Sequence, residues 1–343
     1  MPVVDLRSDT MTYPNADMRR AMAEASLGDD VFGEDPTVNR LQEIAADRMG
    51  KEAAIFVASG TMGNLIAVLL HARPGQEVIA DADAHVFMYE GAGAAALGGV
   101  QIRPLTTPRG LMDTAQVEDA IRPVDDAHQP VTAAVALEDT HNRHGGITWP
   151  LDELGLVAGV ARKHRLTVHL DGARIFNAAV ACDVDPAEIA GCADTVTFCI
   201  SKGLGCPVGS LLCGPRELIG AAHRWRKMLG GGMRQAGVLA AAGIYALDNM
   251  VERLAEDHAN ARTLAEGLAE MDGVECDLER VQTNIVLIHV HAMPVSEFLE
   301  GCKARGLLGA SMGGDSVRFV THYGVGPADV QQALTAAYEA LSG

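Results

Sequence analysis

The chain has 343 residues, of which 48% are hydrophobic, and this composition supports a sizeable core rather than a disordered segment. Its 27 basic and 45 acidic residues give a net charge of −18, which argues against nucleic acid and anionic membrane surfaces as partners. No signal peptide is recognised at the start, and no apolar stretch reaches the roughly twenty residues of a membrane span. We therefore expect a cytoplasmic protein with one large and one small domain.

The first two thirds of the chain alternate short apolar stretches with helical patterns. Asp35 followed by Pro36 predicts the start of a helix that ends at Gly50, because aspartate caps helices and proline fits their first turn. Another apolar helix is predicted to begin near Asn64, and a third over 152–164. Buried strands are predicted at 54–57, 78–80, 133–137, 167–170 and 196–200. This alternation predicts an α/β fold with a mostly parallel central sheet covered on both faces.

The pattern changes near residue 250. A long helix rich in alanine and glutamate is predicted over 254–271, strands follow near 284–290 and 317–320, and a last helix starts after Pro327. The expected organisation is an N-terminal segment and large domain over 1–249, followed by a small C-terminal α+β domain over 250–343.

Chemically distinctive residues follow several of these strands, where open α/β sheets bind ligands. Ser59, Gly60 and Thr61 stand at a strand-to-helix junction, where backbone N–H groups and the helix dipole suit a phosphate. An ordinary tight turn is the alternative interpretation of this stretch. Asp171 ends an apolar strand and lies three residues before Arg174, so it is a functional carboxylate, half of a structural ion pair, or a helix cap.

Two further residues follow strands in the same way. Lys202 lies between serine and glycine just past a strand, where a confined amine can attack a carbonyl. His85 follows the strand at 78–80, and taken alone it is an ordinary structural histidine. As a set, a phosphate cradle, a strand-end aspartate and a strand-end lysine are what pyridoxal phosphate requires. The phosphate is anchored, Lys202 forms a Schiff base, and Asp171 keeps the pyridine nitrogen protonated.

Beyond these residues, the sequence resembles the low-specificity L-threonine aldolases, which are pyridoxal phosphate enzymes of the aspartate aminotransferase fold (fold type I). The resemblance runs nearly end to end and rests on DLRSDT at 5–10, VFGEDPTVN at 31–39, SGTMGN at 59–64, EDTHN at 138–142, HLDGAR at 169–174, SKGLGCPVGS at 201–210 and RWRKMLGGGMRQ at 224–235. It implies retro-aldol cleavage of L-threonine, L-allo-threonine and related β-hydroxy-α-amino acids to glycine and an aldehyde. The reaction is reversible.

The resemblance also implies roles in cofactor binding. These are Lys202 as the Schiff-base lysine, Asp171 at the pyridinium nitrogen, Arg174 at the 3-oxygen of the ring, His85 stacked on the ring, and Ser59, Gly60 and Thr61 at the phosphate. Lys227 and Arg234 are expected to reach the phosphate from a neighbouring subunit. Shared sites of this kind imply a homo-oligomer, namely a tetramer built as a dimer of dimers.

The amino-acid substrate is expected to be held by its carboxylate. Ser8 and Arg318 are the implied clamp, with Arg318 as a bidentate fork and Arg174 beside it. The base that takes the β-hydroxyl proton is His85 or His141, acting directly or through a water, and the sequence does not rank them. No cluster of ligands predicts a metal.

Two departures from the family pattern and several rival functions stay open. Phe32 stands where many relatives carry tyrosine, and Asp139 stands where asparagine is usual. The added charge of Asp139 is expected to raise the pKa of the neighbouring His141.

The rival functions are a phenylserine-type aldolase, another fold type I lyase acting on a β-substituted amino acid, a serine hydroxymethyltransferase-like enzyme, and a regulator without catalysis. The acidic charge argues against the last, since such regulators usually carry a basic DNA-binding domain.

Overall fold

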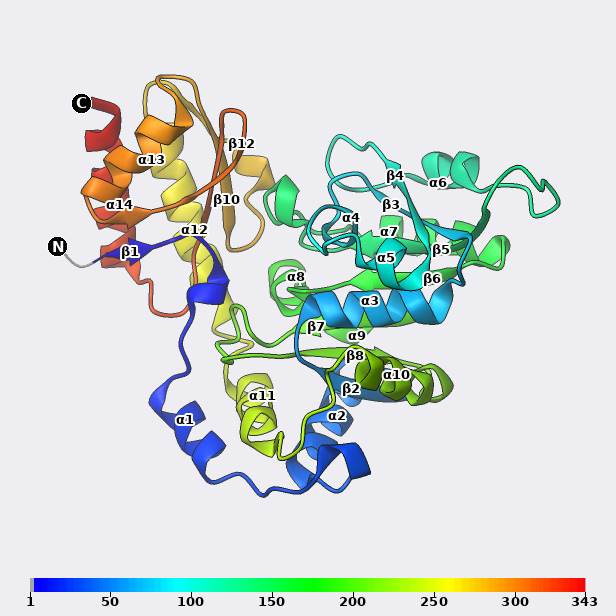
Figure 1. Cartoon of the computed structure of the whole chain (residues 1–343). Helices are drawn as coiled ribbons and strands as arrows, with labels where there is room; N and C mark the ends of the chain where they lie inside the picture. Colours follow the sequence, from blue (N-terminus) through cyan, green and yellow to red (C-terminus); the bar gives the residue numbers. More distant parts are fainter. Residues whose placement is uncertain (1–2, 343) are drawn as a thin grey trace.

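The computed structural model describes residues 3–342 and consists of a larger part around a central sheet and a smaller part built from the C-terminal residues (Figure 1). In the described chain the central sheet has seven strands, in the order β2-β8-β7-β6-β5-β3-β4. Along this order the strands are β2 (Ala53–Val57), β8 (Ser210–Gly214), β7 (Thr195–Cys199), β6 (Thr167–Asp171), β5 (Val131–Glu138), β3 (Gln76–Asp81) and β4 (Gln101–Leu105). Only β8 runs antiparallel to its neighbours, so the predicted mostly parallel sheet is confirmed.

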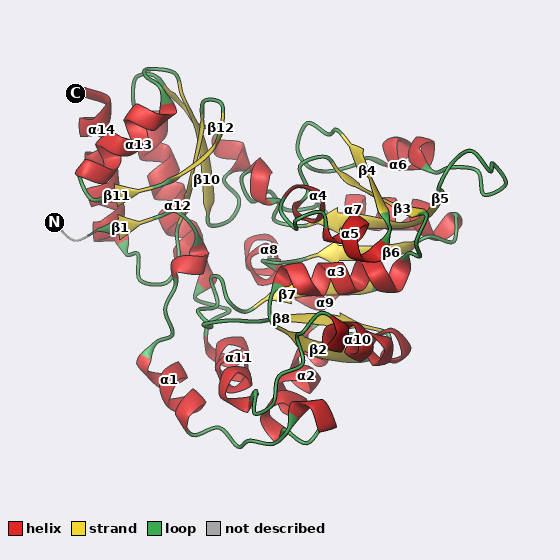
Figure 2. Ribbon diagram, viewed as in Figure 1, coloured by secondary structure: helices red, strands yellow, loops and turns green. Residues whose placement is uncertain are grey.

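Helices cover both faces of this sheet (Figure 2). The side chains of β2 show how the layers form, because successive residues of a strand point to opposite faces. Phe56 packs into the core that also holds α2 (Pro36–Arg48), α7 (Leu151–Lys163), α8 (Ile175–Cys182) and α11 (Gly237–Asn249). Ile55 and Val57 pack instead against α3 (Gly60–His71) and α10 (Arg216–Met228).

Shorter elements complete the larger part of the molecule. The helices are α1 (Ala16–Ala23), α4 (His85–Met88), α5 (Gly93–Gly98), α6 (Thr114–Ala120) and α9 (Pro186–Gly191). The 3-10 turns of the chain are η1 (Asp9–Met11), η2 (Asp30–Phe32), η3 (Asn142–His144) and η4 (Leu278–Arg280). Within residues 3–342, no helix is long and apolar enough to cross a membrane.

Local capping explains where the two best-predicted helices begin. Asp35 caps α2, since its side chain accepts the backbone N–H groups of Thr37 and Val38, and Pro36 occupies the first turn as predicted. The prediction that the next helix begins near Asn64 is wrong by one turn. That helix, α3, begins at Gly60, because the Ser59 hydroxyl accepts the N–H of Met62 and caps it there.

The smaller part has its own core and its own sheet. Its elements are α12 (Leu254–Ala269), β9 (Val274–Glu275), β10 (Ile285–Val290), α13 (Val295–Ala304), β11 (Leu307–Leu308), β12 (Ala310–Gly313), β13 (Ser316–Val320) and α14 (Pro327–Ser342). The sheet has the order β12-β13-β10-β9 and is antiparallel. The N-terminal strand β1 (Val4–Asp5) pairs with β11, and Leu6 is fully buried in the same core. The N-terminal residues thus pack with the smaller part, while the boundary at 249/250 stays a prediction.

Candidate active site

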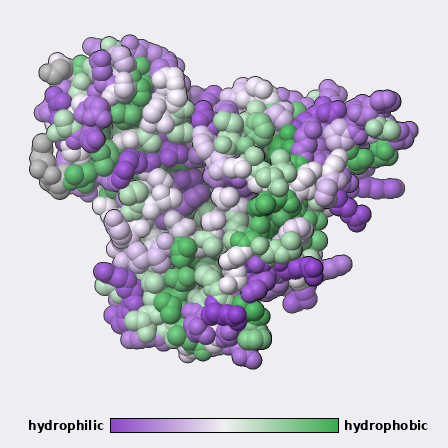
Figure 3. All heavy atoms as spheres, viewed as in Figure 1, coloured by the Kyte–Doolittle hydropathy of each residue, from purple (hydrophilic) through white to green (hydrophobic). Residues whose placement is uncertain are grey.

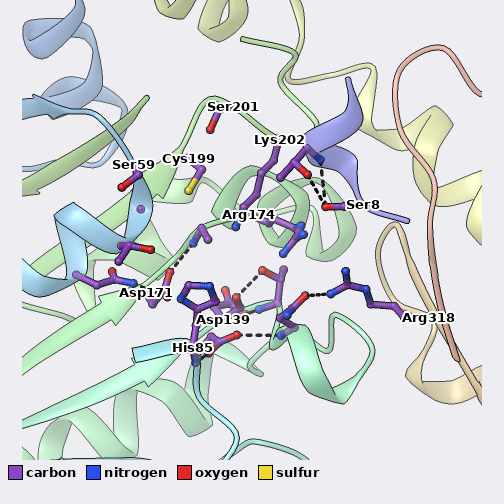
Figure 4. A pocket seen from close by; sticks show the side chains of 18 residues that line it. Ser8, Ser59, His85, Asp139, Asp171, Arg174, Cys199, Ser201, Lys202 and Arg318 are labelled. Carbon is purple, nitrogen blue, oxygen red and sulfur yellow. Dashed lines mark hydrogen bonds between the residues drawn. The ribbon is translucent and has the colours of Figure 1, made fainter. Parts of the chain in front are cut away.

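A cavity of about 290 Å³ lies at the carboxyl ends of the central strands. The predicted residues that line it are Ser8, Ser59, Gly60, Thr61, His85, Asp171, Arg174, Lys202 and Arg318. Lys202 and Arg174 enter from one side, and His85 and Asp171 approach from the other (Figure 4). The structure therefore brings together residues that the sequence places on three strand ends, one helix start, the N-terminal segment and β13.

The N-terminus of α3 forms one end of the cavity. Its first backbone N–H groups have no partner inside the helix, which makes them suitable for an anion. Gly60 is required here because a Cβ atom at this position would lie 2.8 Å from the sulfur of Cys199. Thr61 lines the same end of the cavity. These residues can hold a phosphate group.

Asp171 is held by a network that the sequence analysis missed. The amide nitrogen of Asn64 donates to Asp171 Oδ2 at 2.7 Å and to Glu90 Oε1 at 2.8 Å, and the N–H of Ala173 donates to Asp171 Oδ1 at 3.1 Å. Oδ1 of Asn64 in turn lies 3.1 Å from Nε2 of His169. Asn64 falls inside the SGTMGN stretch, so the family match was a signal that could have identified it.

His85 lies across the cavity from Lys202 and is fixed at two points (Figure 4). Its Nδ1 atom is 2.8 Å from Glu90 Oε1, and its backbone N–H donates to Glu138 Oε2 at 2.6 Å. Burial lowers the pKa of His85, but the hydrogen bond with Glu90 and the charge of Asp171 outweigh burial and raise that pKa above its ordinary value. The ring is thereby oriented, with Nε2 free of this contact.

Arg174 forms a buried bidentate ion pair with Asp9. Its Nε and Nη2 atoms lie 2.6 Å and 2.8 Å from the two carboxylate oxygens of Asp9. Burial alone would raise the pKa of Asp9, but the guanidinium of Arg174 outweighs it and holds that pKa well below its usual range. Asp9 therefore takes the N–H of Nε and one N–H of Nη2, whereas Nη1 makes no recorded hydrogen bond and faces a bound ligand unengaged.

Arg318 is the second guanidinium at this end. Nη1 donates to Oδ1 of Asn142 at 2.5 Å and Nη2 to the carbonyl of Arg7 at 3.1 Å, whereas the buried Nε has no hydrogen-bond partner among the described residues. Burial and the charge of Arg174 lower the pKa of Arg318 to about 10, so it remains charged at neutral pH. Ser8 lines the same region, and its hydroxyl oxygen accepts the N–H of Thr10. This end suits a carboxylate.

The structure does not bring His141 to the cavity. Its side chain is fully buried, 3.2 Å from Asp81 and 3.9 Å from Glu138, and it is absent from the lining. Burial lowers the pKa of His141, but the charges of Glu138 and Asp81 outweigh burial and raise it. The pKa of His141 is thus raised as expected, but its main causes are Glu138, Asp81 and Asp83 rather than Asp139.

Asp139 instead serves the local backbone. Its carboxylate accepts the N–H groups of Thr140 and Trp149, and burial raises its own pKa to about 6. The neighbouring Glu138, which the sequence analysis did not single out, lines the cavity. Its two oxygens accept the N–H groups of His85 and Asn142, so Glu138 ties both of these residues to the end of β5.

Lys227 and Arg234 also lie outside the lining of this cavity. Arg234 forms an ion pair with Asp29 at 3.0 Å, and its side chain is 55% exposed. Phe32 is 74% exposed and does not line the cavity either. A contribution of Lys227 and Arg234 to a neighbouring subunit's site stays a prediction.

Comparison with known proteins identifies relatives of the whole chain. The model of the beta-eliminating lyase family matches residues 5–292. The low specificity L-threonine aldolase of Escherichia coli (strain K12) is 47% identical and covers 94% of this chain and 95% of its own. The low-specificity L-threonine aldolase 1 of Arabidopsis thaliana is 40% identical, with 99% and 97% covered.

A solved structure shows the same fold. The threonine aldolase of Leishmania major superposes with a TM-score of 0.82 at 20% identity, and the match covers 98% of this chain and 99% of that one. The predicted fold type I architecture is therefore confirmed. The family model and the sequence relatives show that the chain belongs to the beta-eliminating lyase family, among the low-specificity L-threonine aldolases.

Proposed function

We propose that this chain cleaves L-threonine, L-allo-threonine and related β-hydroxy-α-amino acids to glycine and an aldehyde, with pyridoxal phosphate as the cofactor. The observation that carries the proposal is the single cavity in which Lys202, Asp171 and the start of α3 meet the guanidinium of Arg318. The first three suit the cofactor, and the last suits the carboxylate of an amino acid.

The residues fit pyridoxal phosphate chemically. The start of α3 offers N–H groups to the phosphate, with Gly60 leaving the space that a Cβ atom would fill. Lys202 offers its amine to the aldehyde carbon, and Asp171 offers a fixed carboxylate that holds a proton at the pyridine nitrogen. When bound, the cofactor accepts the electron pair of the Cα–Cβ bond that breaks.

The residues that bind the substrate carboxylate would determine which bond of the substrate breaks. Arg318 and Ser8 would bind the substrate carboxylate and thereby hold the Cα–Cβ bond perpendicular to the cofactor plane, the orientation in which that bond is the one to break. Arg174 would add mainly its Nη1 atom, because Asp9 takes the N–H of Nε and one N–H of Nη2. The ion pair with Asp9 thus positions Arg174 and still leaves N–H groups of its guanidinium available to the substrate.

His85 is the better candidate for the base. It lines the cavity, and Glu90 fixes the ring through Nδ1, so Nε2 can take the β-hydroxyl proton directly or through a water. His141 does not line the cavity and would act only through an intervening group such as Glu138.

The chain would work as a homo-oligomer with shared sites, a tetramer built as a dimer of dimers, in the cytoplasm. Lys227 and Arg234 lie outside the cavity of their own chain, which leaves them available to a neighbour. Hydrophobic residues are also exposed on α5 and α11, where Leu97 and Val238 reach the surface, and subunit contacts bury surfaces of this type (Figure 3).

The test is the release of acetaldehyde from L-threonine and from L-allo-threonine, measured separately with purified protein and pyridoxal phosphate. Release from either substrate is expected, and the ratio of the two rates reports the diastereomer preference. Release from neither, while glycine still shifts the absorption of the cofactor, would move the substrate to a larger β-hydroxy amino acid such as phenylserine.

Replacement of the cofactor lysine gives the matching variant test. Lys202→Ala is expected to reduce turnover to background and to abolish covalent attachment of the cofactor, because no other lysine lines the described cavity. The control is Lys303→Ala, whose exposed amine lies in α13 and should be dispensable. If Lys202→Ala kept both properties, the assignment would be wrong.

A further inference from the structure

A second cluster of titratable side chains lies outside the cavity lining, at the carboxyl ends of two neighbouring parallel strands. Asp81 ends β3, and His141 and His144 lie three residues apart in the turn that follows β5. One possible ligand atom from each of the three lies within 4.8 Å of the other two. Two imidazoles and a carboxylate are a donor set that binds zinc and similar divalent cations.

The distances between these atoms match a small coordination site. Asp81 Oδ1 lies 3.2 Å from Nε2 of His141 and 4.0 Å from Nε2 of His144. Ligand atoms about 2.1 Å from a tetrahedral zinc ion lie roughly 3.4 Å from one another. The first pair is already at that spacing, and the second would close by less than 1 Å.

Carboxylates approach the ring nitrogens of this cluster, but none of these contacts is an aligned hydrogen bond. His141 is fully buried, and neither of its ring nitrogens, nor Nε2 of His144, makes a hydrogen bond within residues 3–342. The approach of His141 to Asp81 is an ion-pair contact without the alignment of a hydrogen bond. A buried polar group without a hydrogen bond destabilises the folded protein, and a bound cation would satisfy these ring nitrogens.

The surrounding chain holds the three side chains in place. The hydroxyl of Thr107 donates to Asp81 Oδ2 at 2.8 Å, and the backbone N–H of Asp83 donates to Oδ1 at 2.8 Å. Together they fix the carboxylate with Oδ1 3.2 Å from Nε2 of His141. The backbone of Gly110 packs on both rings, since a Cβ atom there would lie 2.5 Å from His141 Cδ2 and 2.7 Å from His144 Cδ2. Partners that orient ligands in this way are typical of metal sites.

Neighbouring charges favour a cation. Asp83 Oδ2 lies 3.3 Å from Nε2 of His144, and the Asp83 side chain is 40% exposed, so the cluster has a negatively charged edge open to solvent. Arg143 contacts the other oxygen of Asp83 at 3.3 Å and leaves Oδ2 to the cluster.

We propose that Asp81, His141 and His144 bind one divalent cation of the zinc type. The ion would stiffen the turn after β5. This turn carries Asn142, whose side-chain oxygen receives the hydrogen bond of Arg318 in the cavity. The inference is independent of which substrate the cavity takes.

The experiment measures zinc binding by the cofactor-loaded enzyme after removal of metal with a chelator. An exposed pair of histidines, His289 and His291, lies near Asp315 and would bind zinc weakly, so both are first replaced by glutamine. Calorimetric titration of this background protein with zinc is expected to give one ion per chain. Cobalt in place of zinc should give the visible absorption of a tetrahedral site.

Variants of the ligands test the location. Asp81→Asn and His144→Gln are each expected to weaken zinc binding at least about a hundredfold, since loss of a ligand exceeds the 10–100-fold effect of losing a supporting residue. His164→Gln, which removes a histidine paired with Glu118 elsewhere, is the matched control and should bind as the background protein does. Retained cofactor absorption shows that each variant is folded.

Two results would overturn the proposal. One is a background protein that binds no zinc, and the other is zinc binding that Asp81→Asn and His144→Gln leave unchanged. If those variants lose the cofactor, Thr107→Val decides, because it keeps all three ligands and removes only the hydroxyl that orients Asp81. It should weaken binding about 10–100-fold, and undiminished binding would equally refute the site.

Discussion

In the hydrogen-bond network around Asp171, the donor and acceptor roles of each residue follow from those of its neighbour. Asn64 donates through its amide nitrogen to Asp171, so its Oδ1 must accept, and Nε2 of His169 must carry the proton that it accepts. Nδ1 of His169 then accepts from the hydroxyl of Thr195 at 3.0 Å. Protonation of Nδ1 would break this chain. A neutral His169 is therefore part of what holds the carboxylate at the cofactor nitrogen.

This residue makes folding stability dependent on pH. Burial lowers the pKa of His169 to about 3, whereas the unfolded chain takes up the proton near 6.5. Between these values the unfolded state binds more protons, so the contribution of His169 is present above pH 6.5 and is lost as the pH falls. At 1.36 kcal/mol per pKa unit, about 2 kcal/mol is lost between pH 7.5 and pH 5.

His169→Asn should remove that pH dependence. The free energy of unfolding is measured in urea at pH 7.5 and pH 5 for the variant and the unaltered protein, so that contributions from other histidines cancel in the difference. The variant is expected to be less stable at pH 7.5 but to lose about 2 kcal/mol less on acidification. His128→Asn, at a fully exposed position, is the control. Equal losses on acidification in both proteins would contradict the argument.

At the scale of elements, Asp35 joins three segments. Its Oδ1 accepts the first N–H groups of α2, while Oδ2 accepts the N–H of Gly28 at 3.2 Å and that of Gly237, at the start of α11, at 2.9 Å. Asp35 is fully buried. Asp113 caps α6 from an exposed position and has no such second set of partners among its recorded hydrogen bonds.

Asp35→Ala is therefore expected to cost more than the loss of an ordinary cap. We expect the free energy of unfolding to fall by about 3 kcal/mol, roughly 1 for the cap and the rest for buried N–H groups left unpaired. Asp113→Ala should cost about 1 kcal/mol. Urea denaturation of both variants checks the difference. Equal losses would show that the hydrogen bonds of Asp35 with Gly28 and Gly237 contribute nothing to stability.

At the scale of the whole molecule, the expectation of shared sites can be tested by complementation. Lys202→Ala lacks the cofactor lysine, and Arg234→Ala lacks the side chain expected in the neighbour's site. Co-expression of the two in equal amounts should restore about a quarter of full activity, because half of the dimers are mixed and each has one intact site of two. Activity no higher than the average of the two separate variants would show that each chain completes its own site.

The sequence predicted the α/β pattern well because each element has its own local signal. Apolar stretches of strand length, the Asp35–Pro36 start of α2 and the residues at strand ends can all be recognised without knowledge of neighbours. The start of α3 was misplaced because the apolar periodicity begins later than the cap at Ser59. Periodicity reports burial, whereas capping decides where a helix begins.

Lys202 and Asp171 could be named from the sequence because their side chains carry the chemistry and lie in short motifs, whereas Arg318 could be named only through the family resemblance. Their supporting partners could not, because support depends on contacts between distant segments. Asp9 reaches Arg174, Glu90 reaches His85, and neither pairing has a spacing in the sequence that identifies it. The sequence by itself thus determined the fold class and the chemically active groups. Only the tertiary structure decided which candidates share the cavity, excluded His141 from its lining and placed that histidine beside Asp81, because burial and distance arise only when the strands pack side by side.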